Sequence, residues 1–480
     1  MKRIFPAFGF VSMSLLVAIT ACANNNDTLY KTQHQKPMAV IADADNAGLK
    51  LPSGFGALKV ADNVGRARHI TVASNGIAYV KSGRLIGGKG IFQLKDADGD
   101  GKAEVAKTFG NFSGTGIIIK NGYLYACSDE QVFRYQLDAN NDVINPDQPE
   151  IVITGLISRG QHANKTVALD DAGNIYVNIG AFSNSCQEKD RSNGSKGKLP
   201  CPILDSAGGI WKFKADKLNQ TYADGVKYAT GLRNVVGLRW NSQTNSLFVM
   251  QHGRDQLYQN WSQFYDSLAS AELPSECMYE VKQGSNCGWP YTYYDHLQQK
   301  IMIAPEYGGD GKLSYEDYMK QVIKNTPVTV SSSVNSKGQN VNPTNFALMA
   351  DDGNKLKMDK WFQKPAAAYP GHMAPNDILF YTGNQFPEKY KNGAFIAFHG
   401  SWNRSPLPQK GYFVVFQPFK NGKPSGDWEV FADGFSGKDV VISTRGAEHR
   451  PCGLAQGADG SLYVSDDSKG TIYRIVYSGK

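Results

Sequence analysis

A short apolar segment follows a polar turn at six places along the chain. The turns combine Asn, Asp or Thr with Gly or Asn, and each following segment is rich in β-branched or aromatic residues, as β-strands are. The six segments are 77–80, 123–126, 174–177, 246–249, 394–397 and 461–464. Most recur at intervals of about 45 to 75 residues, the length of one elaborated four-stranded sheet. The pattern therefore predicts an all-β fold, a six-bladed β-propeller.

One interval is longer, because about 150 residues separate the fourth segment from the fifth. We expect an irregular or helical insertion over about 256–369, with helical patterns at 261–265 and 314–325. The last strand, 471–477, is expected to pair with an early strand near 58–60. Such pairing would close the ring and remove exposed sheet edges.

The first 47 residues differ from the rest of the chain. Lys2 and Arg3 precede an apolar run at 8–21 that is short for a membrane span and ends at Cys22, a pattern that resembles a lipoprotein lipobox. We expect residues 1–22 to be a lipoprotein signal peptide, Cys22 to be acylated, and 23–47 to be a flexible polar tether to a propeller at 48–480. The protein would then be lipid-anchored in a bacterial cell envelope, facing the periplasm, with the outer membrane as the expected site. A plain secretory signal is the alternative.

Composition limits the partners and the crosslinks. Lys and Arg number 51 against 44 Asp and Glu, and the net charge of +7 is too mild and too scattered to predict a nucleic acid partner. Six cysteines follow Cys22, and export to an oxidising compartment favours disulfides. By spacing, the expected pairs are Cys186 with Cys201 and Cys277 with Cys287. Cys127 and Cys452 are left open.

The segment 231–255 predicts a hairpin with polar groups at one edge. Arg233 and Asn234 precede its first strand, and 252–255 (His-Gly-Arg-Asp) follow its second strand. An antiparallel pair brings both groups together and makes a cationic edge that suits an anionic ligand. An ordinary surface turn is the alternative.

His162 also precedes a predicted strand, where a histidine facing the axial channel could accept a proton, although a surface or capping role is possible.

A second candidate is the acidic loop 96–101 (Asp-Ala-Asp-Gly-Asp-Gly). Alternating carboxylates can converge on calcium, but a calcium-binding EF-hand loop would need glutamate at its twelfth position, which is Lys107 here. We therefore favour a turn at the end of a blade strand, with a loosely bound ion as the alternative.

Several motifs in one order resemble the PQQ-dependent sugar dehydrogenases, the soluble aldose and L-sorbosone dehydrogenase group. They cover about residues 50–480 and comprise His162 before its strand, 231–234 (GLRN), 252–255 (HGRD), 286–290 (NCGWP), 370–375 (PGHMAP), 399–404 (HGSWNR) and 449–454 (HRPCGL). The resemblance implies oxidation of an aldose or a related sugar or aldehyde. Electrons would pass through PQQ to a periplasmic acceptor such as a c-type cytochrome.

The resemblance also implies roles for particular residues. His162 would be the catalytic base, and Arg233 would steady the developing negative charge. Because PQQ is a tricarboxylate, cations would hold its rim; the implied cofactor-binding residues are Arg233, Asn234, Arg404 and Arg450, with Lys410 as an alternative to Arg404. Calcium would be bound by the main-chain carbonyls of Gly253 and Arg254. His372, His399 and His449 could be site residues or structural ones.

Two other classes stay open. A propeller lactonase would bind an axial divalent metal through Glu, Asn and Asp side chains and activate water. A noncatalytic propeller that binds a glycan or a protein is the other, since a fold alone does not give a function.

Overall fold

The structure is a computed structural model that describes Met1, residues 40–325 and residues 362–479. The predicted signal peptide beyond Met1, the predicted acylation site Cys22 and most of the predicted tether lie outside the described residues. Within the described part, no helix has the length and apolar character needed to cross a bilayer.

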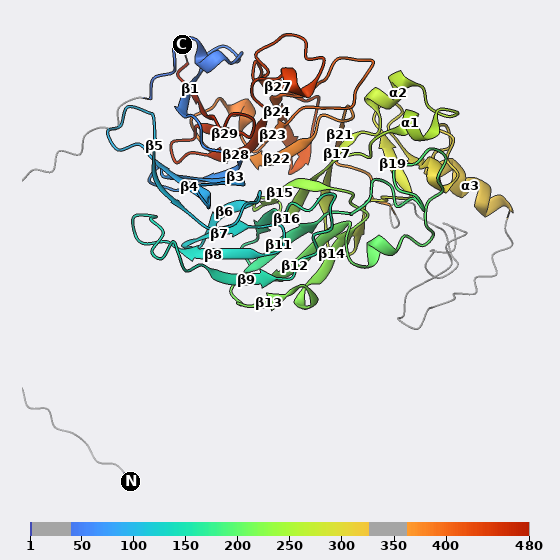
Figure 1. Cartoon of the computed structure of the whole chain (residues 1–480), viewed down its shortest axis with the longest axis horizontal. Helices are drawn as coiled ribbons and strands as arrows, with labels where there is room; N and C mark the ends of the chain where they lie inside the picture. Colours follow the sequence, from blue (N-terminus) through green and yellow to red (C-terminus); the bar gives the residue numbers. More distant parts are fainter. Residues whose placement is uncertain (2–39, 326–361, 480) are drawn as a thin grey trace, which may run out of the picture. The chain divides into compact units, whose positions relative to one another are not determined.

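Six four-stranded antiparallel sheets follow one another along the chain (Figure 1). We number them one to six. The first sheet has β2 (Ala67–Val72), β3 (Ala78–Ile86), β4 (Lys89–Lys95) and β5 (Glu104–Phe109), and the second has β6 (Ile117–Lys120), β7 (Tyr123–Cys127), β8 (Val132–Gln136) and β9 (Glu150–Thr154). The third has β10 (Val167–Leu169), β11 (Asn174–Ile179), β12 (Gly209–Lys214) and β14 (Val226–Thr230), and the fourth has β15 (Val235–Asn241), β16 (Ser246–Gln251), β17 (Glu276–Val281) and β21 (Ala367–Tyr369). The fifth has β22 (Pro375–Phe380), β23 (Ala394–Phe398), β24 (Phe413–Gln417) and β27 (Glu429–Ala432), and the sixth has β28 (Pro451–Gln456), β29 (Leu462–Asp466), β30 (Ile472–Tyr477) and β1 (Phe55–Ala61).

Short elements complete the description. Two-residue strands extend the second and third sheets in parallel, β13 (Gln220–Thr221) beside β9 and β18 (Ser285–Asn286) beside β14. Two small hairpins lie outside the sheets: β19 (Thr292–Asp295) with β20 (Lys300–Ile303), and β25 (Phe419–Lys420) with β26 (Lys423–Pro424). The 3-10 turns are η1 (Asn46–Gly48), η2 (Pro202–Asp205), η3 (Tyr222–Asp224), η4 (Pro305–Tyr307), η7 (Glu388–Tyr390) and η8 (Thr444–Gly446).

The six-bladed propeller predicted from the repeated segments is confirmed. Each segment falls in the second strand of its sheet: β3, β7, β11, β16, β23 and β29. The first strands β2, β6, β10, β15, β22 and β28 contact one another in that order around the ring, and β28 contacts β2. Aromatic side chains fill the space between and within the sheets, and Tyr79, Tyr135 and Tyr473 are fully buried. Burial of an aromatic side chain stabilises a core by about 1.5–3 kcal/mol.

The predicted closure of the ring is also confirmed. β1 pairs with β30 in antiparallel register, with Leu58 opposite Arg474 and Lys59 opposite Tyr473. The sixth sheet therefore contains strands from both ends of the propeller, so the ring has no open edge where it begins and ends.

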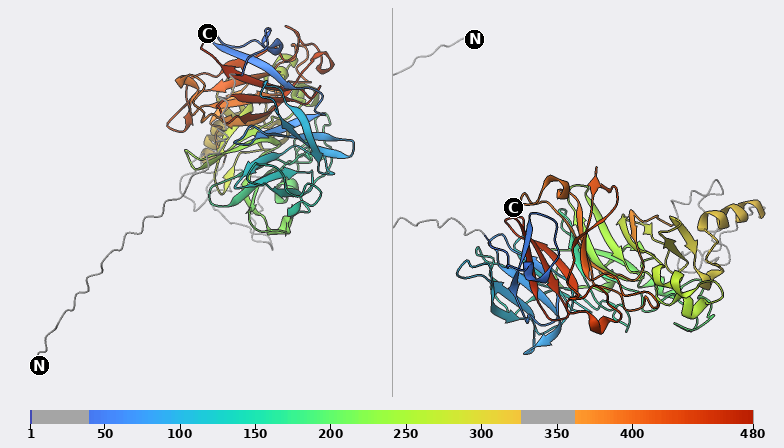
Figure 2. Two further views of the ribbon diagram at one scale, coloured as in Figure 1. Left: turned by 90° about the vertical axis from the view of Figure 1, so that its left-hand side faces the viewer. Right: turned by 90° about the horizontal axis from the view of Figure 1, so that it is seen from above.

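The predicted insertion 256–369 needs a correction, because it contains two strands of the fourth sheet. β17 and β21 pair within that sheet, and both faces of β17 are covered: Tyr279 packs into one apolar cluster and Met278 into another. A strand buried on both faces lacks polar alternation, which is why the pattern did not separate it. The helices α1 (Leu257–Trp261), α2 (Ser267–Glu272) and α3 (Tyr315–Asn325) confirm the helical character, and α3 lies well outside the sheets (Figure 2).

The predicted tether also ends earlier than residue 47. Asp43 donates its backbone N–H to Ala57 O at 2.9 Å, and its carboxylate accepts the N–H of Lys59 at 3.0 Å. Ala47 is buried and packs with the aromatic cluster that contains Phe55. Residues 40–47 thus belong to the propeller body.

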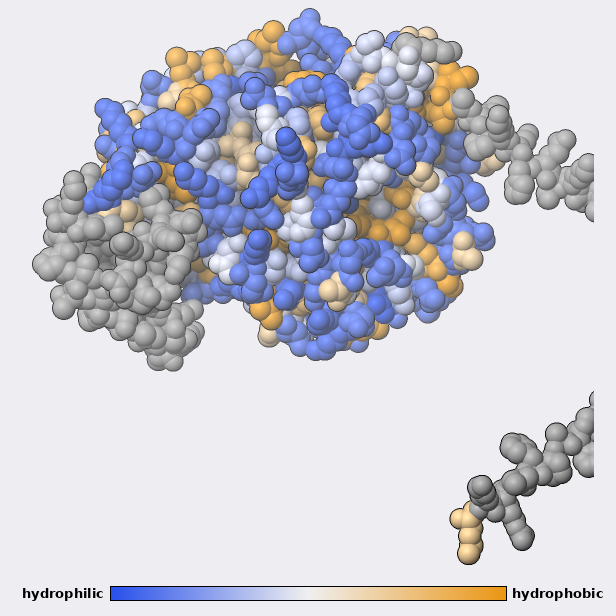
Figure 3. Space-filling model, turned by 180° about the vertical axis from the view of Figure 1, so that it is seen from behind, coloured by the Kyte–Doolittle hydropathy of each residue, from blue (hydrophilic) through white to orange (hydrophobic). Residues whose placement is uncertain are grey.

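Hydrophilic residues predominate on the face of the molecule shown in Figure 3.

Candidate functional site

One end of the ring carries polar residues from all six sheets, because the residue before a first strand and the residue after a second strand lie at the same end. Hydrogen bonds there join each sheet to the next. They are Arg68 Nε to Thr115 Oγ1 (3.2 Å), Gly116 N to Lys165 O (3.0 Å), Arg233 Nε to Asn184 O (3.1 Å), His252 Nε2 to Pro375 O (3.0 Å), His399 Nε2 to Asp467 Oδ1 (2.6 Å) and Arg68 Nη1 to Asp467 Oδ2 (2.7 Å). We call these residues the polar ring, together with Arg450, which directly precedes β28 and donates to His399 O at the same end.

His162 lies directly before the third sheet, with a left-handed backbone (φ 55°). Its Nδ1 is 2.5 Å from the carbonyl oxygen of Ala181. A carbonyl only accepts, so Nδ1 carries the proton and Nε2 keeps its lone pair. Burial, and then the nearby Arg233 charge, lower the pKa of His162 to about 3. The imidazole is therefore neutral at neutral pH and can accept a proton at Nε2.

Arg233 is buried and its guanidinium is fixed by four hydrogen bonds. Nε and Nη2 donate to the carbonyl and side-chain oxygens of Asn184, Nη1 donates to Gly253 O, and Nη2 donates to Asp255 Oδ2 at 2.7 Å. Of the five N–H groups of an arginine, one on Nη1 remains for a ligand. Arg233 and Arg191 hold the pKa of Asp255 well below its usual range despite burial. The charge of Arg233 is thus largely offset within the protein.

Asn234 and His252 face each other across the hairpin. Asn234 Nδ2 lies 3.3 Å from His252 Nδ1, while Nε2 of His252 donates to Pro375 O. The buried side-chain oxygen of Asn234 has no hydrogen-bond partner among the described residues. Burial lowers the pKa of His252 to about 4. Asn234 therefore offers an unsatisfied acceptor at the place where the sequence predicted a neutral ligand contact.

The predicted calcium carbonyls belong to the turn after β16. Gly253 O already accepts from Arg233 at 2.9 Å, but a carbonyl oxygen has a second lone pair. Two buried carboxylates flank the turn: Glu276 accepts the N–H of Gly253 at 3.1 Å, and Asp255 follows Arg254 in the chain. The side chain of Arg254 points elsewhere, to an ion pair with Glu306. Burial raises the pKa of Glu276 to about 8, so this carboxyl group is largely neutral at pH 7, and Asp255 is paired with Arg233. The candidate calcium ligands are therefore the main-chain oxygens themselves, a ligand type that calcium accepts.

Arg404 is held by the insertion. Its guanidinium pairs with Glu272 and donates to Ala271 O (2.6 Å) and Gly371 O (3.1 Å), and the side chain is buried. Its hydrogen bonds fasten the loop after β23 to the end of α2. Its predicted contact with PQQ stays a prediction.

Arg450 differs from the other arginines of the polar ring, because it forms no ion pair within the described part of the chain. It donates to His399 O (3.1 Å) and Gly400 O (2.8 Å), and its guanidinium lies 5.7 Å from the centre of the Tyr412 ring. Burial lowers its pKa. Arg450 therefore has positive charge to offer an anion.

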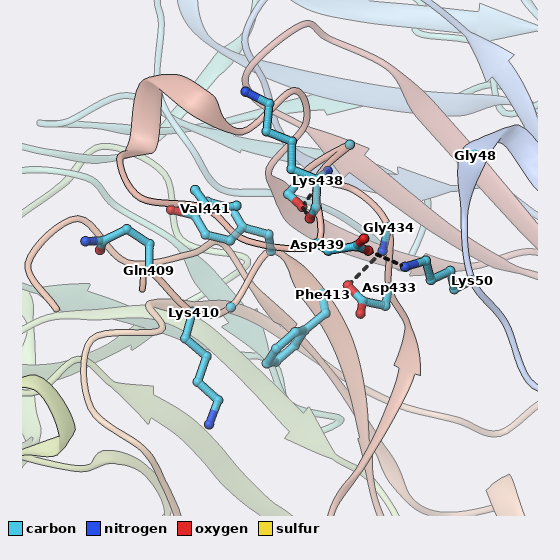
Figure 4. Close-up of a pocket in the computed structure, with 14 residues that line it drawn as sticks. Gly48, Lys50, Gln409, Lys410, Phe413, Asp433, Gly434, Lys438, Asp439 and Val441 are labelled. Carbon is cyan, nitrogen blue, oxygen red and sulfur yellow. Dashed lines mark hydrogen bonds and ion pairs between the residues drawn. The ribbon is translucent and has the colours of Figure 1, made fainter. Parts of the chain in front are cut away.

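A separate pocket of about 460 Å³, which Tyr412 also lines, is shown in Figure 4. The loop after β23 and the loop between β27 and β28 form it together with Lys50, which pairs with Asp439 at 2.9 Å. Lys410, the alternative to Arg404, lines this pocket. His162, Arg233 and Asn234 do not.

A buried group that the sequence reasoning missed joins three sheets. Asp467 accepts from His399 Nε2 and from Arg68 Nη1, and these hydrogen bonds with the Arg68 charge keep the pKa of Asp467 well below its usual range despite burial. Burial lowers the pKa of His399 itself. The position of Asp467 in the sequence could have indicated it, because Asp467 directly follows the second strand of its sheet, as His252 does in the fourth sheet.

Cys186 and Cys201 form the predicted disulfide. The second prediction is wrong, since Cys277 and Cys287 are free, as are Cys127 and Cys452. Cys277 and Cys287 lie in one buried apolar cluster, where both thiols pack as small hydrophobic groups and burial raises their pKa. The spacing predicted their neighbourhood but not their redox state.

The acidic loop lies between β4 and β5, as a turn at the end of a blade strand. Asp96 accepts the backbone N–H of Gly99 (2.7 Å) and of Gly101 (2.9 Å). In the described ranges, Asp96, Asp98 and Asp100 are the one set of three or more candidate ligands whose atoms converge, and all three are exposed. Among the described residues, no such converging set of acidic side chains lies at the polar end of the ring.

The fold and the polar ring define a class: six-bladed β-propellers with a histidine and several arginines gathered at one end of the ring. The model of the TrAA12-like family matches residues 49–302 and 327–478. The chain belongs to this family.

Two curated relatives are similar over parts of their length. A pyrroloquinoline quinone-dependent pyranose dehydrogenase of Coprinopsis cinerea is 35% identical over 313 residues, covering 59% of this chain and 36% of that protein. An uncharacterized protein of Borreliella burgdorferi is 34% identical over 125 residues, covering 26% and 31%. The chain thus spans about a third of the length of these relatives.

Solved structures agree on the fold. A calcium structure of the Trichoderma reesei Carbohydrate-Active Enzymes Family AA12 protein superimposes with a TM-score of 0.63 at 16% identity, over 92% of this chain and 100% of that one. The holo form of the pyranose dehydrogenase PQQ domain from Coprinopsis cinerea gives 0.60 at 19% identity, over 89% and 97%.

Proposed function

We propose that the protein is a PQQ-dependent dehydrogenase that oxidises an aldose or a related sugar or aldehyde. The observation that carries the proposal is the convergence, at one end of the ring, of His162 with an open Nε2 and of Arg233, Asn234 and Arg450. The relative from Coprinopsis cinerea, named a PQQ-dependent pyranose dehydrogenase, supports the same reaction class.

The residues fit a flat tricarboxylate. Arg450 brings a charge without an ion-pair partner in the described chain, and Arg233 keeps one free N–H; the unpaired oxygen of Asn234 can face only a donor of the cofactor, because carboxylates accept hydrogen bonds. When bound, PQQ supplies a two-electron acceptor for the hydride of the substrate. Nε2 of His162 takes the hydroxyl proton of the substrate, and the fixed guanidinium of Arg233 stabilises the negative charge that develops on that oxygen.

Calcium and the cell-envelope assignment are further parts of the proposal. The main-chain carbonyls of Gly253 and Arg254 would bind calcium. Acylation of Cys22 would anchor the chain to a bacterial membrane facing the periplasm, where an acceptor such as a c-type cytochrome would collect the electrons.

The test uses the purified protein with PQQ, calcium and a redox dye, with a panel of aldoses and pyranoses as substrates. We expect the absorption spectrum of bound PQQ and substrate-dependent dye reduction. His162→Ala should keep PQQ and lose most of the turnover, whereas Arg450→Ala should weaken PQQ binding. Absence of both binding and dye reduction would refute the function. The reverse pattern in the two variants would refute the assigned roles.

A further inference from the structure

The loop between β11 and η2 brings a fully buried asparagine against the polar ring. Asn184 lies two residues before Cys186, whose disulfide to Cys201 closes the loop. Ser183 adds a local anchor, because its hydroxyl accepts the N–H of Cys186 at 2.9 Å. The loop is thus fastened beside Asn184 by a covalent bond.

Asn184 uses each polar group of its side chain to join Arg233 to the Asp255 turn. Its Oδ1 accepts from Arg233 Nη2 (3.0 Å) and from Asp255 N (2.8 Å), and its Nδ2 donates to Asp255 O (2.9 Å). Its carbonyl oxygen accepts from Arg233 Nε and from Trp289 Nε1, both at 3.1 Å. Two of the four hydrogen bonds that fix Arg233 therefore end on this one residue.

The same loop reaches the residue next to His162. Asp190 accepts the N–H of Asn184 at 3.0 Å and the side-chain N–H of Gln161 at 2.8 Å. Arg191 donates to Gln161 Oε1 (2.9 Å) and to Asp255 Oδ2 (3.0 Å). One segment, 183–191, thus connects the neighbour of His162 with the partners of Arg233.

We propose that Asn184 is a positioning residue, which acts on cofactor binding and turnover through Arg233. The inference rests on the proposed function and deepens it. Asn184 Oδ1 and Asp255 Oδ2 share the two N–H groups of Arg233 Nη2, and the Asn184 side chain also holds Asp255 N and Asp255 O. Without that side chain, Nη2 keeps only Asp255 and the Asp255 turn loses two hydrogen bonds, so the guanidinium and its carboxylate partner can shift together.

The test is a double-mutant cycle of Asn184→Ala and Arg233→Ala, with Asn193→Ala as a control. Asn193 is an exposed asparagine of the same disulfide-closed loop. The readouts are the Kd for PQQ from absorbance titration in calcium buffer, and kcat and KM from dye reduction. Asn184→Ala should raise the Kd about 10-fold, since it removes the hydrogen bond from Arg233 Nη2 to Oδ1, while the bond from Arg233 Nε to the main-chain oxygen of residue 184 remains. In the Arg233→Ala background it should add about 2-fold or less. The control should match the wild type.

The outcomes separate the two proposals. If the wild type binds no PQQ, the proposed function fails and this inference fails with it. If the wild type binds PQQ and Asn184→Ala equals Asn193→Ala, or if its effect multiplies fully with that of Arg233→Ala, only the inference is overturned. Should Asn184→Ala not fold, Asn184→Asp takes its place: it keeps both accepting contacts of Oδ1, but its carboxylate offsets the charge of Arg233, so it should raise the Kd for PQQ in the wild-type background and have little effect in the Arg233→Ala background. Equal effects in the two backgrounds would overturn the inference.

Discussion

Gly180 offers a direct test of whether His162 is the base, because it touches that residue without being part of the chemistry. A β-carbon added at Gly180 would lie 2.5 Å from the carbonyl oxygen of His162 and 2.6 Å from its Cβ. Ordinary contact begins at 3.4 Å, so the backbone of His162 would have to move by about 0.9 Å. A displacement of this size at a reacting group lowers turnover by about 100-fold.

We therefore expect Gly180→Ala to lower kcat about 100-fold, with a loss of about 1–3 kcal/mol in the free energy of unfolding from overpacking. The Kd for PQQ should change far less, because Arg233 and Arg450 stay in place. Dye reduction, PQQ titration and thermal unfolding measure the three quantities. Gly446→Ala is the matched control, since its added β-carbon would have Lys438 Nζ at 3.7 Å as its nearest neighbour. A folded, PQQ-loaded Gly180→Ala enzyme with wild-type kcat would refute the role of His162.

Three further predictions concern charge and crosslinking. The acid limb of kcat/KM should lie below pH 6.5, because protonated His162 cannot act as a base and the pKa of His162 is lowered to about 3. Arg233→Ala removes a nearby positive charge, so in a pH series it should move the acid limb to higher pH. An unmoved limb would show that the Arg233 charge does not lower the pKa of the base. Replacing both Cys186 and Cys201 with Ser should lower the free energy of unfolding by about 3 kcal/mol in a urea titration, and an unchanged midpoint would argue against an ordered, closed loop. Arg254→Met should lower the free energy of unfolding by about 3–5 kcal/mol in the same urea titration, because it leaves the buried Glu306 carboxylate unpaired. The double variant Arg254→Met/Glu306→Gln should regain part of that stability. If it regains none, the ion pair is not the cause of the loss.

The strand pattern was sufficient to predict the ring, because each second strand carries apolar residues after a turn and only six such units occur. It failed at β17, where both faces are buried and no alternation remains. For the site, the hairpin logic placed Arg233, Asn234 and His252 together. The sequence could not show that Arg404 turns to Glu272, or that Asn184 meets Arg233 across 49 residues, since such contacts depend on how separate loops pack.

The polar ring contains more arginines than free positive charges. Asp255 pairs with Arg233, and Asp467 pairs with Arg68, so within the described residues these two pairs are close to neutral. Arg450 is the arginine of the polar ring without such a partner.

Arg450 and the buried Lys165, which has no ion pair among the described residues and whose pKa burial lowers to about 8, bring at most two positive charges against the three of a tricarboxylate, and unpaired charge is costly in a buried site. A divalent cation at the Gly253 turn would supply the missing charge. We therefore expect PQQ and calcium to bind together, so that EGTA raises the Kd for PQQ and added calcium restores it, while Arg450→Ala makes the dependence on calcium steeper. Equal PQQ affinity with EGTA and with calcium would show that the charge is balanced by other groups.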